Sequence, residues 1–162
     1  MAQILACEFP DHLFYQVDYD VWLEPQADGT VRVGMTDPAQ TRAGRILHVR
    51  VREGRRVAEG KSLATVESGK WVGPMPSPLP GRVVAKNPRL EEDPSLINRD
   101  PYGAGWVVGL QPDVEPDAWS RYGVVPAALA LEPFRRRLEE AGISCLRCLD
   151  PGSPDPTVGE GG

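Results

Sequence analysis

The sequence contains few cysteines, few aromatic residues and no long apolar run. Only 3 of its 162 residues are cysteine, and 7% are aromatic. Three cysteines, an odd number, do not make a disulfide framework of the kind that stabilises small secreted domains. No apolar stretch approaches the roughly 20 residues that cross a bilayer, and the first residues lack the basic segment and apolar run of a signal peptide. We therefore expect a cytoplasmic chain with reduced thiols that does not enter a membrane.

An excess of positive charge is also absent. The chain has 18 Lys and Arg residues against 23 Asp and Glu residues, for a net charge of −5. Because phosphate binding requires a basic face, we expect no nucleic-acid partner. An acidic surface suits contacts with basic patches on other proteins. The length and the 41% hydrophobic content support one modest core rather than two large domains.

Glycine and proline, with 17 residues each, divide the chain into short runs. Between them lie segments that alternate apolar and polar residues, which is typical of strands: 19–23, 31–33, 45–51, 61–67 and 106–110. Segments 44–49 and 81–86 resemble each other and flank the middle of the chain. This approximate internal repeat predicts two short antiparallel sheets that face each other, as in a sandwich or a barrel.

Helices are expected to be short and few. Asp37 and Pro38 suit the N-cap and the first position of a helix that Gly44 ends. Residues 88–98 and 113–122 predict brief helical turns. A longer helix over 126–141 would place Leu129, Phe134, Leu138 and Ala141 on one face, with Gly142 as its stop.

One lysine lies between two expected strands. Residues 61–67 form the first strand and a second extended run opens at Trp71, so that Gly69 and Lys70 make a two-residue hairpin connection. Glycine at the first central position suits a type II′ turn. Lys70 would then lie at a tight exposed tip, where a lysine can be covalently modified. The alternative is an ordinary solvated turn lysine.

The sequence around this lysine resembles a known family. Glu67-Ser68-Gly69-Lys70 followed by Ser77-Pro78-Leu79-Pro80-Gly81-Arg82-Val83-Val84 is similar to the pattern around the lipoylated lysine of glycine-cleavage H proteins. Residues 28–40 and 96–106 also match this family, and the resemblance extends from Phe9 to Pro112.

The resemblance implies a cofactor and the residues that present it. Lipoate would be covalently attached to Lys70 by a lipoate ligase or a lipoyl transferase. Glu67, Ser68 and Gly69 would help that enzyme to recognise the hairpin, and Gly81 would allow a neighbouring turn to pack closely.

The implied fold is mainly β, a barrel-sandwich hybrid with short flanking helices. We expect an N-terminal extension over residues 1–8 and a lipoyl-carrier domain over 9–112. A C-terminal helical extension would cover 113–149, and a disordered tail 150–162.

The implied function is that of a carrier rather than an enzyme. A group would travel on the lipoyl arm between partner enzymes. In a glycine cleavage system these are glycine decarboxylase, aminomethyltransferase and dihydrolipoamide dehydrogenase.

Three departures from the family favour a related carrier. Gly69 and Trp71 replace the residues usual beside the lysine, Val21 removes a carboxylate next to Trp22, and the chain continues past Gly142. They are more like the H-like lipoate-binding proteins of bacterial sulfur oxidation, which work with a heterodisulfide-reductase-like complex. Glycine cleavage is the alternative, and an unmodified scaffold is the third reading.

Cys145 and Cys148 form a Cys-x-x-Cys pair. Such a pair is a weak candidate for a redox or sulfur-handling dithiol, or for half of a zinc site. The other possible ligands, Cys7, His12 and His48, do not form a second half-site by their spacing. We therefore expect no metal. The alternative to a redox role is that Cys145 and Cys148 are thiols without a chemical role.

Overall fold

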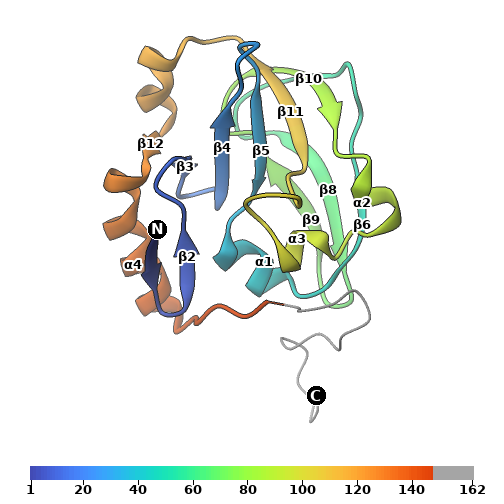
Figure 1. Cartoon of the computed structure of the whole chain (residues 1–162). Helices are drawn as coiled ribbons and strands as arrows, with labels where there is room; N and C mark the ends of the chain where they lie inside the picture. Colours follow the sequence, from blue (N-terminus) through green and yellow to red (C-terminus); the bar gives the residue numbers. More distant parts are fainter. Residues whose placement is uncertain (148–162) are drawn as a thin grey trace.

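The structure is a computed structural model, and it describes residues 1–147. It is mainly β, as expected (Figure 1). The strands are β1 (Ala2–Ile4), β2 (Cys7–Phe9), β3 (Phe14–Gln16), β4 (Val21–Pro25), β5 (Val31–Met35), β6 (Ile46–Arg50), β7 (Arg56–Val57), β8 (Ser62–Ser68), β9 (Val72–Pro76), β10 (Gly81–Lys86), β11 (Val108–Pro112) and β12 (Val124–Pro126). The helices are α1 (Asp37–Ala43), α2 (Arg89–Glu92), α3 (Leu96–Arg99), the 3₁₀ helix η1 (Pro116–Tyr122) and α4 (Ala127–Ala141).

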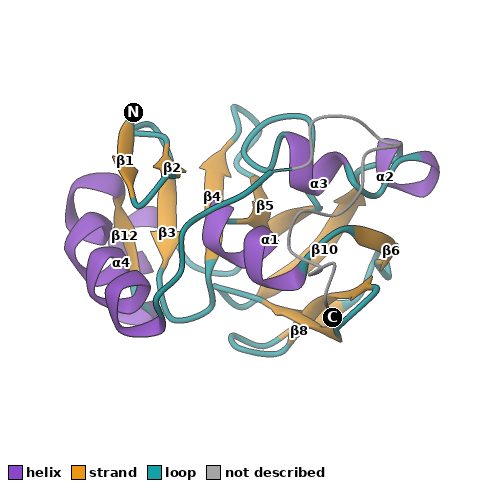
Figure 2. Cartoon of the chain, turned by 90° about the horizontal axis from the view of Figure 1, so that it is seen from below, coloured by secondary structure: helices purple, strands orange, loops and turns teal. Residues whose placement is uncertain are grey.

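The strands form two main antiparallel sheets and one small hairpin. The larger sheet has seven strands in the order β12-β3-β4-β5-β11-β10-β7. The smaller sheet has the order β6-β8-β9, and β1 pairs with β2. The large sheet curls, so that the small sheet packs against it in the way expected for a barrel-sandwich hybrid (Figures 1 and 2).

One hydrophobic core joins the two main sheets. Val33 and Leu110 of the large sheet belong to the same buried cluster as Val66 and Met75 of the small sheet. Along β8 the side chains alternate, with Val66 buried and Thr65 exposed. Burial of one such aliphatic side chain contributes about 1.5–3 kcal/mol, so the shared core fixes which face of β8 points inward.

Helix α1 begins one residue earlier than expected. Its N-cap is Thr36 rather than Asp37, because the Thr36 hydroxyl oxygen accepts a hydrogen bond from the backbone nitrogen of Ala39 at 3.2 Å. Asp37 is instead the first helical residue. Gly44 ends the helix as expected, with a φ of 80° that favours glycine.

The two ends of the described chain pack together in a second cluster. The ring of Phe9 in β2 stacks on Phe134 of α4 with centroids 4.6 Å apart. Helix α4 lies beside β12 and β3 at the edge of the large sheet (Figure 1). The expected positions of Leu129 and Ala141 on the buried face are wrong, because 64% of Leu129 is exposed and Ala141 is exposed as well. Ala130 lies on that face beside Phe134 and Leu138.

The expectation of reduced cysteines is wrong for two of the three. Cys7 and Cys145 form a disulfide that joins β2 to the segment after α4. The sequence did not predict this pair, because the two cysteines are 138 positions apart. They meet only because β2 packs against α4. Cys148, the other member of the Cys-x-x-Cys pair, lies outside the described residues.

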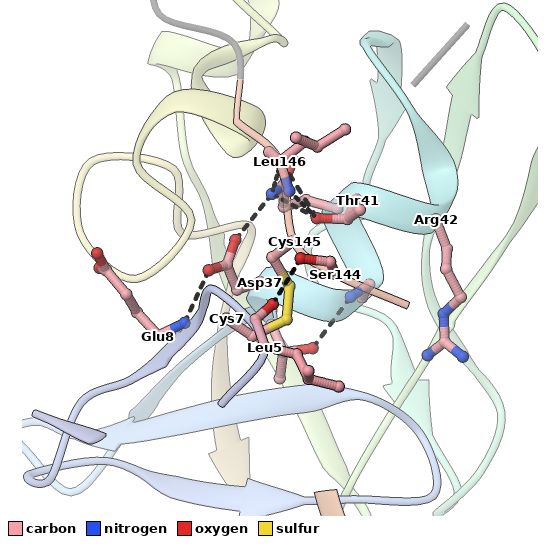
Figure 3. The surroundings of a disulfide bond; sticks show 12 residues. Leu5, Cys7, Glu8, Asp37, Thr41, Arg42, Ser144, Cys145 and Leu146 are labelled. Atoms are coloured by element: carbon pink, nitrogen blue, oxygen red, sulfur yellow. Dashed lines mark hydrogen bonds between the residues drawn. A yellow bond between two sulfur atoms is a disulfide. The ribbon is translucent and has the colours of Figure 1, made fainter. Parts of the chain in front are cut away.

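Residues 143–147, here called the C-terminal strap, lie along α1 (Figure 3). The carbonyl oxygen of Leu146 accepts hydrogen bonds from the side chains of Gln40 and Thr41 at 2.6 and 3.1 Å. Arg147 forms an ion pair with the buried carboxylate of Asp37 at 3.1 Å. The strap therefore ties the end of the described chain to the helix.

Over residues 1–147, no helix is long and apolar enough to cross a membrane.

We predict that the Cys7–Cys145 disulfide stabilises the fold. Cys145→Ser should lower the free energy of unfolding by about 2–5 kcal/mol, because the unfolded chain loses a crosslink that closes a long loop. Denaturant unfolding without reductant measures the change, and Cys148→Ser is the matched control that should retain the wild-type stability. Equal stability of the Cys145→Ser variant and the wild type would contradict the prediction.

Candidate functional site

The hairpin between β8 and β9 has the predicted two-residue connection. Glu67 pairs with Val72, and the backbone nitrogen of Ser68 donates to the carbonyl oxygen of Trp71 at 2.8 Å. Gly69 and Lys70 are the two residues between, and both are exposed. The structure therefore presents Lys70 at the tip of a hairpin whose strands belong to the small sheet.

The predicted type II′ turn is wrong. Such a turn requires a left-handed φ at its first central residue, and neither Gly69 nor Lys70 has one. The hydroxyl oxygen of Ser68 accepts the backbone N–H of Lys70 at 3.3 Å, and this contact holds the turn in another conformation. A Cβ atom at Gly69 would meet no atom within 4 Å, so glycine is not needed there for space.

The other predicted site residues divide into two groups. Ser68 is buried at the base of the turn, and Glu67 lies next to it on the outward face of the small sheet. Gly81 lies in β10, away from the tip, where a Cβ would collide with the backbone carbonyl of Gln111 in β11. Ser68 and Glu67 thus adjoin Lys70, whereas Gly81 allows two strands of the large sheet to approach closely.

Trp71 lies directly after the lysine and was not predicted as a site residue. Its indole folds back over Gly73, where a Cβ would collide with the ring. The side chain is 39% exposed, and it lines a cleft beside the hairpin. A tryptophan followed two residues later by glycine on the same strand face is the sequence signal that could have indicated this packing.

The cleft has a volume of about 380 Å³ and lies between the two sheets. Its walls come from the start of β4, from α1 and from the hairpin: Tyr19, Asp20, Val21, Met35, Ala39, Arg42, Ala43, Val66, Trp71, Pro74, Met75 and Pro76. Most of these side chains are apolar. A flexible group attached to Lys70 would therefore have a sheltered, largely apolar surface next to its point of attachment.

The polar part of the cleft is an ion pair. Asp20 is buried and has a left-handed φ of 60°, and its carboxylate accepts a hydrogen bond from Thr36 at 2.6 Å. Arg42 of α1 forms an ion pair with the other oxygen of this carboxylate. Burial, and secondly the charge of Arg137, lowers the pKa of Arg42 from its usual value. Both signs of charge are thus present at the cleft, but each is already partnered.

The comparisons with known proteins agree with this geometry. A sequence model described as Glycine cleavage H-protein matches residues 13–120. The chain is 42% identical over 146 residues to glycine cleavage system H protein 3 of Aquifex aeolicus, covering 89% of this chain and 91% of that protein. It is 40% identical over 142 residues to H protein 2 of the same organism, covering 86% of each.

A solved structure extends the likeness to the fold. The crystal structure of a glycine cleavage system H protein from Mycobacterium marinum matches with a TM-score of 0.64 and 30% identity, over 83% of this chain and all of that one. The chain belongs to the glycine cleavage H-protein family. Members of this family are carriers rather than catalysts, and they bear lipoate covalently on a lysine. An exposed lysine on a braced hairpin, beside an apolar cleft, fits such a group.

The cysteines and histidines that the sequence analysis weighed as possible metal ligands do not come together among the described residues. Within residues 1–147, no group of three or more His, Cys, Asp and Glu residues could hold a metal ion. His12 lies 3.2 Å from Glu24, and His48 is exposed on β6. Cys7 and Cys145 are joined to each other, so neither is a thiol in this structure.

We predict that a substitution at Gly81 destabilises the fold, whereas one at Gly69 leaves its stability nearly unchanged. Gly81→Ala should cost about 1–3 kcal/mol of stability, because the new methyl group overpacks against β11. Gly69→Val, with open space and an ordinary φ, should change stability by no more than about 0.5 kcal/mol. Chemical denaturation of the two variants measures both changes. A large loss of stability in the Gly69→Val variant would contradict the prediction, because it would indicate a left-handed φ at Gly69.

Proposed function

We propose that this chain carries lipoate on Lys70 and serves as the aminomethyl carrier of a glycine cleavage system. The observation that carries the proposal is the position of Lys70 at an exposed hairpin tip next to the cleft. Membership of the H-protein family supports both the cofactor and the pathway. The chain itself makes and breaks no bonds with the travelling group.

The role of the protein is to hold and shelter the arm. Attached lipoate supplies a dithiol that takes up and releases a group by thiol–disulfide chemistry. Lys70 provides the attachment point, and the hydrogen bonds at Ser68 keep the tip in one conformation. Trp71 and Pro74 offer apolar surface beside it. A tethered group reaches each bound enzyme at a high effective concentration, which is the advantage of a carrier.

The proposed partners follow from the pathway. A lipoate ligase or lipoyl transferase would modify Lys70, with Glu67, Ser68 and Gly69 as its recognition residues. Glycine decarboxylase would load the arm, aminomethyltransferase would unload it, and dihydrolipoamide dehydrogenase would reoxidise it. We place these reactions in the cytoplasm, where H proteins are found in bacteria.

A second candidate is the sulfur carrier that the sequence favoured, working with a heterodisulfide-reductase-like complex. The relatives are named for glycine cleavage and give no support to this candidate. One observation favours it, namely the lining of the cleft. Val21, which stands where the H-protein pattern that the sequence resembles has a carboxylate, lines the cleft. The nearby carboxylate of Asp20 is paired with Arg42. A cationic aminomethyl group gains less from such a lining than from an unpaired carboxylate.

We predict that the lipoylated protein supports glycine decarboxylation. In a reconstituted system it should replace an authentic H protein, with a turnover within about tenfold of that obtained with the authentic protein. A tenfold difference in rate corresponds to only about 1.4 kcal/mol of transition-state free energy. Lys70→Arg should fold normally, accept no lipoate and give background turnover, whereas Lys61→Arg is the matched control that should retain activity.

The same assay separates the two candidates. Background turnover by the fully lipoylated wild type would contradict the glycine cleavage proposal. Transfer of sulfane sulfur onto the reduced arm of that same sample, absent from the Lys70→Arg variant, would then establish the sulfur carrier.

A further inference from the structure

Three arginines on this acidic chain are without an acidic partner. Arg50, Arg52 and Arg55 are exposed, and no carboxylate of residues 1–147 forms an ion pair with them. Their neighbour Arg56 differs, because it pairs with Asp113 at 2.7 Å. The whole chain has a net charge of −5, so acidic groups are plentiful elsewhere on it. The three guanidinium groups are therefore available to a ligand from outside.

The three arginines border one hollow. Together with Ser62 and Thr65 they line a hollow of about 210 Å³ at the end of the small sheet. Like charges held close together repel one another, and a negatively charged partner removes that cost. The hollow thus presents a local positive field on a negatively charged protein.

This hollow continues toward the lysine along the outward face of the small sheet. In the backbone register of the small sheet, Arg50 of β6 lies opposite Thr65 of β8, and His48 of β6 lies opposite Glu67 of β8. Glu67 lies in turn opposite Val72 of β9. These residues also line an adjoining hollow of about 520 Å³. Thr65 precedes Lys70 by five residues, so at about 3.3 Å per residue the arginine end lies within roughly 17 Å of the lysine.

We propose that this outward face, defined by Arg50, Arg52, Arg55, His48 and Val72 and here called the arginine face, is a docking surface for a carboxylate-rich patch on an enzyme that acts on the arm. The inference rests on the proposed function in one respect, that Lys70 bears the arm. A stable interface buries about 800 Å² on each partner, which corresponds to a patch roughly 30 Å across. An enzyme of that footprint on the arginine face would also cover the hairpin tip.

The chemistry favours a protein surface over a small anion. The arginines are exposed rather than enclosed, and Arg50 borders both adjoining hollows. Val72, which is 62% exposed, adds apolar contact near the lysine. A positive face on an otherwise acidic molecule also orients an approaching partner, because the remaining surface repels the same acidic patch.

The test uses the lipoylated full-length protein and glycine decarboxylase. Arg50→Gln, Arg52→Gln and Arg55→Gln are combined in one variant. The control combines Arg121→Gln, Arg135→Gln and Arg136→Gln, which change the net charge equally but lie on η1 and α4 at the other side of the molecule (Figure 1). At low ionic strength the first variant should raise KM about tenfold with kcat unchanged, and the difference should shrink in high salt.

Two kinetic outcomes would overturn the inference while leaving the proposed function intact. One is an unchanged KM for the arginine-face variant. The other is an equal rise in both variants, which would reflect net charge alone. If the wild type gives no turnover, the proposed function fails instead, and a direct binding measurement decides the docking surface.

That measurement is an NMR titration of the arginine Nε–H signals with a short polyglutamate peptide. Shifts at Arg50, Arg52 and Arg55, lost in the arginine-face variant, would support the proposal. No shift, or equally tight binding of inorganic phosphate alone, would overturn it, the latter in favour of a small-anion site. A doubling of the solution mass that the arginine-face variant abolishes would also overturn it, because the occupant would then be a second copy of the chain.

Discussion

The burial of one face of the small sheet against the large sheet is the constraint on which the site depends. Val66 and Met75 are almost completely buried in the core that the two sheets share. Because side chains alternate along a strand, burying this face forces the next residues outward and directs the hairpin tip to the surface. A shift of β8 by one residue would exchange the two faces and bury polar side chains. The position of Lys70 is thus set by apolar packing several residues away.

The cleft beside the lysine depends on how α1 is held at one end of the two sheets (Figures 1 and 2). The buried side chain of Asn98 in α3 accepts the backbone N–H of Ile46 at 2.9 Å and donates to the carbonyl oxygen of Gly44 at 2.8 Å. It also donates to the side-chain oxygen of Gln40 at 3.1 Å. One amide therefore joins α3, α1 and the start of β6. The C-terminal strap contacts α1 as well, through residues that do not line the cleft.

Local patterns in the sequence predicted five of the longer strands (β4, β5, β6, β8 and β11), the two-residue hairpin and the lysine at its tip, because each depends on neighbours in the chain. The short strands β1, β2, β3, β7 and β12 were not predicted. The features that were missed depend on distant contacts. The Cys7–Cys145 disulfide requires β2 to pack against α4, and the cleft requires Trp71, Arg42 and Val21 to come together from separate elements. The type II′ turn was wrong for a different reason. Glycine in the first central position permitted that turn, but the hydrogen bonds of Ser68 hold another one.

Peptide mapping of the protein isolated from its native host decides whether Lys70 is the lipoyl attachment site. We predict one lipoyl group per chain, on the peptide that contains Lys70, with unmodified lysines at positions 61 and 86. An intact mass without the adduct, or lipoate on Lys61 or Lys86 in place of Lys70, would contradict it.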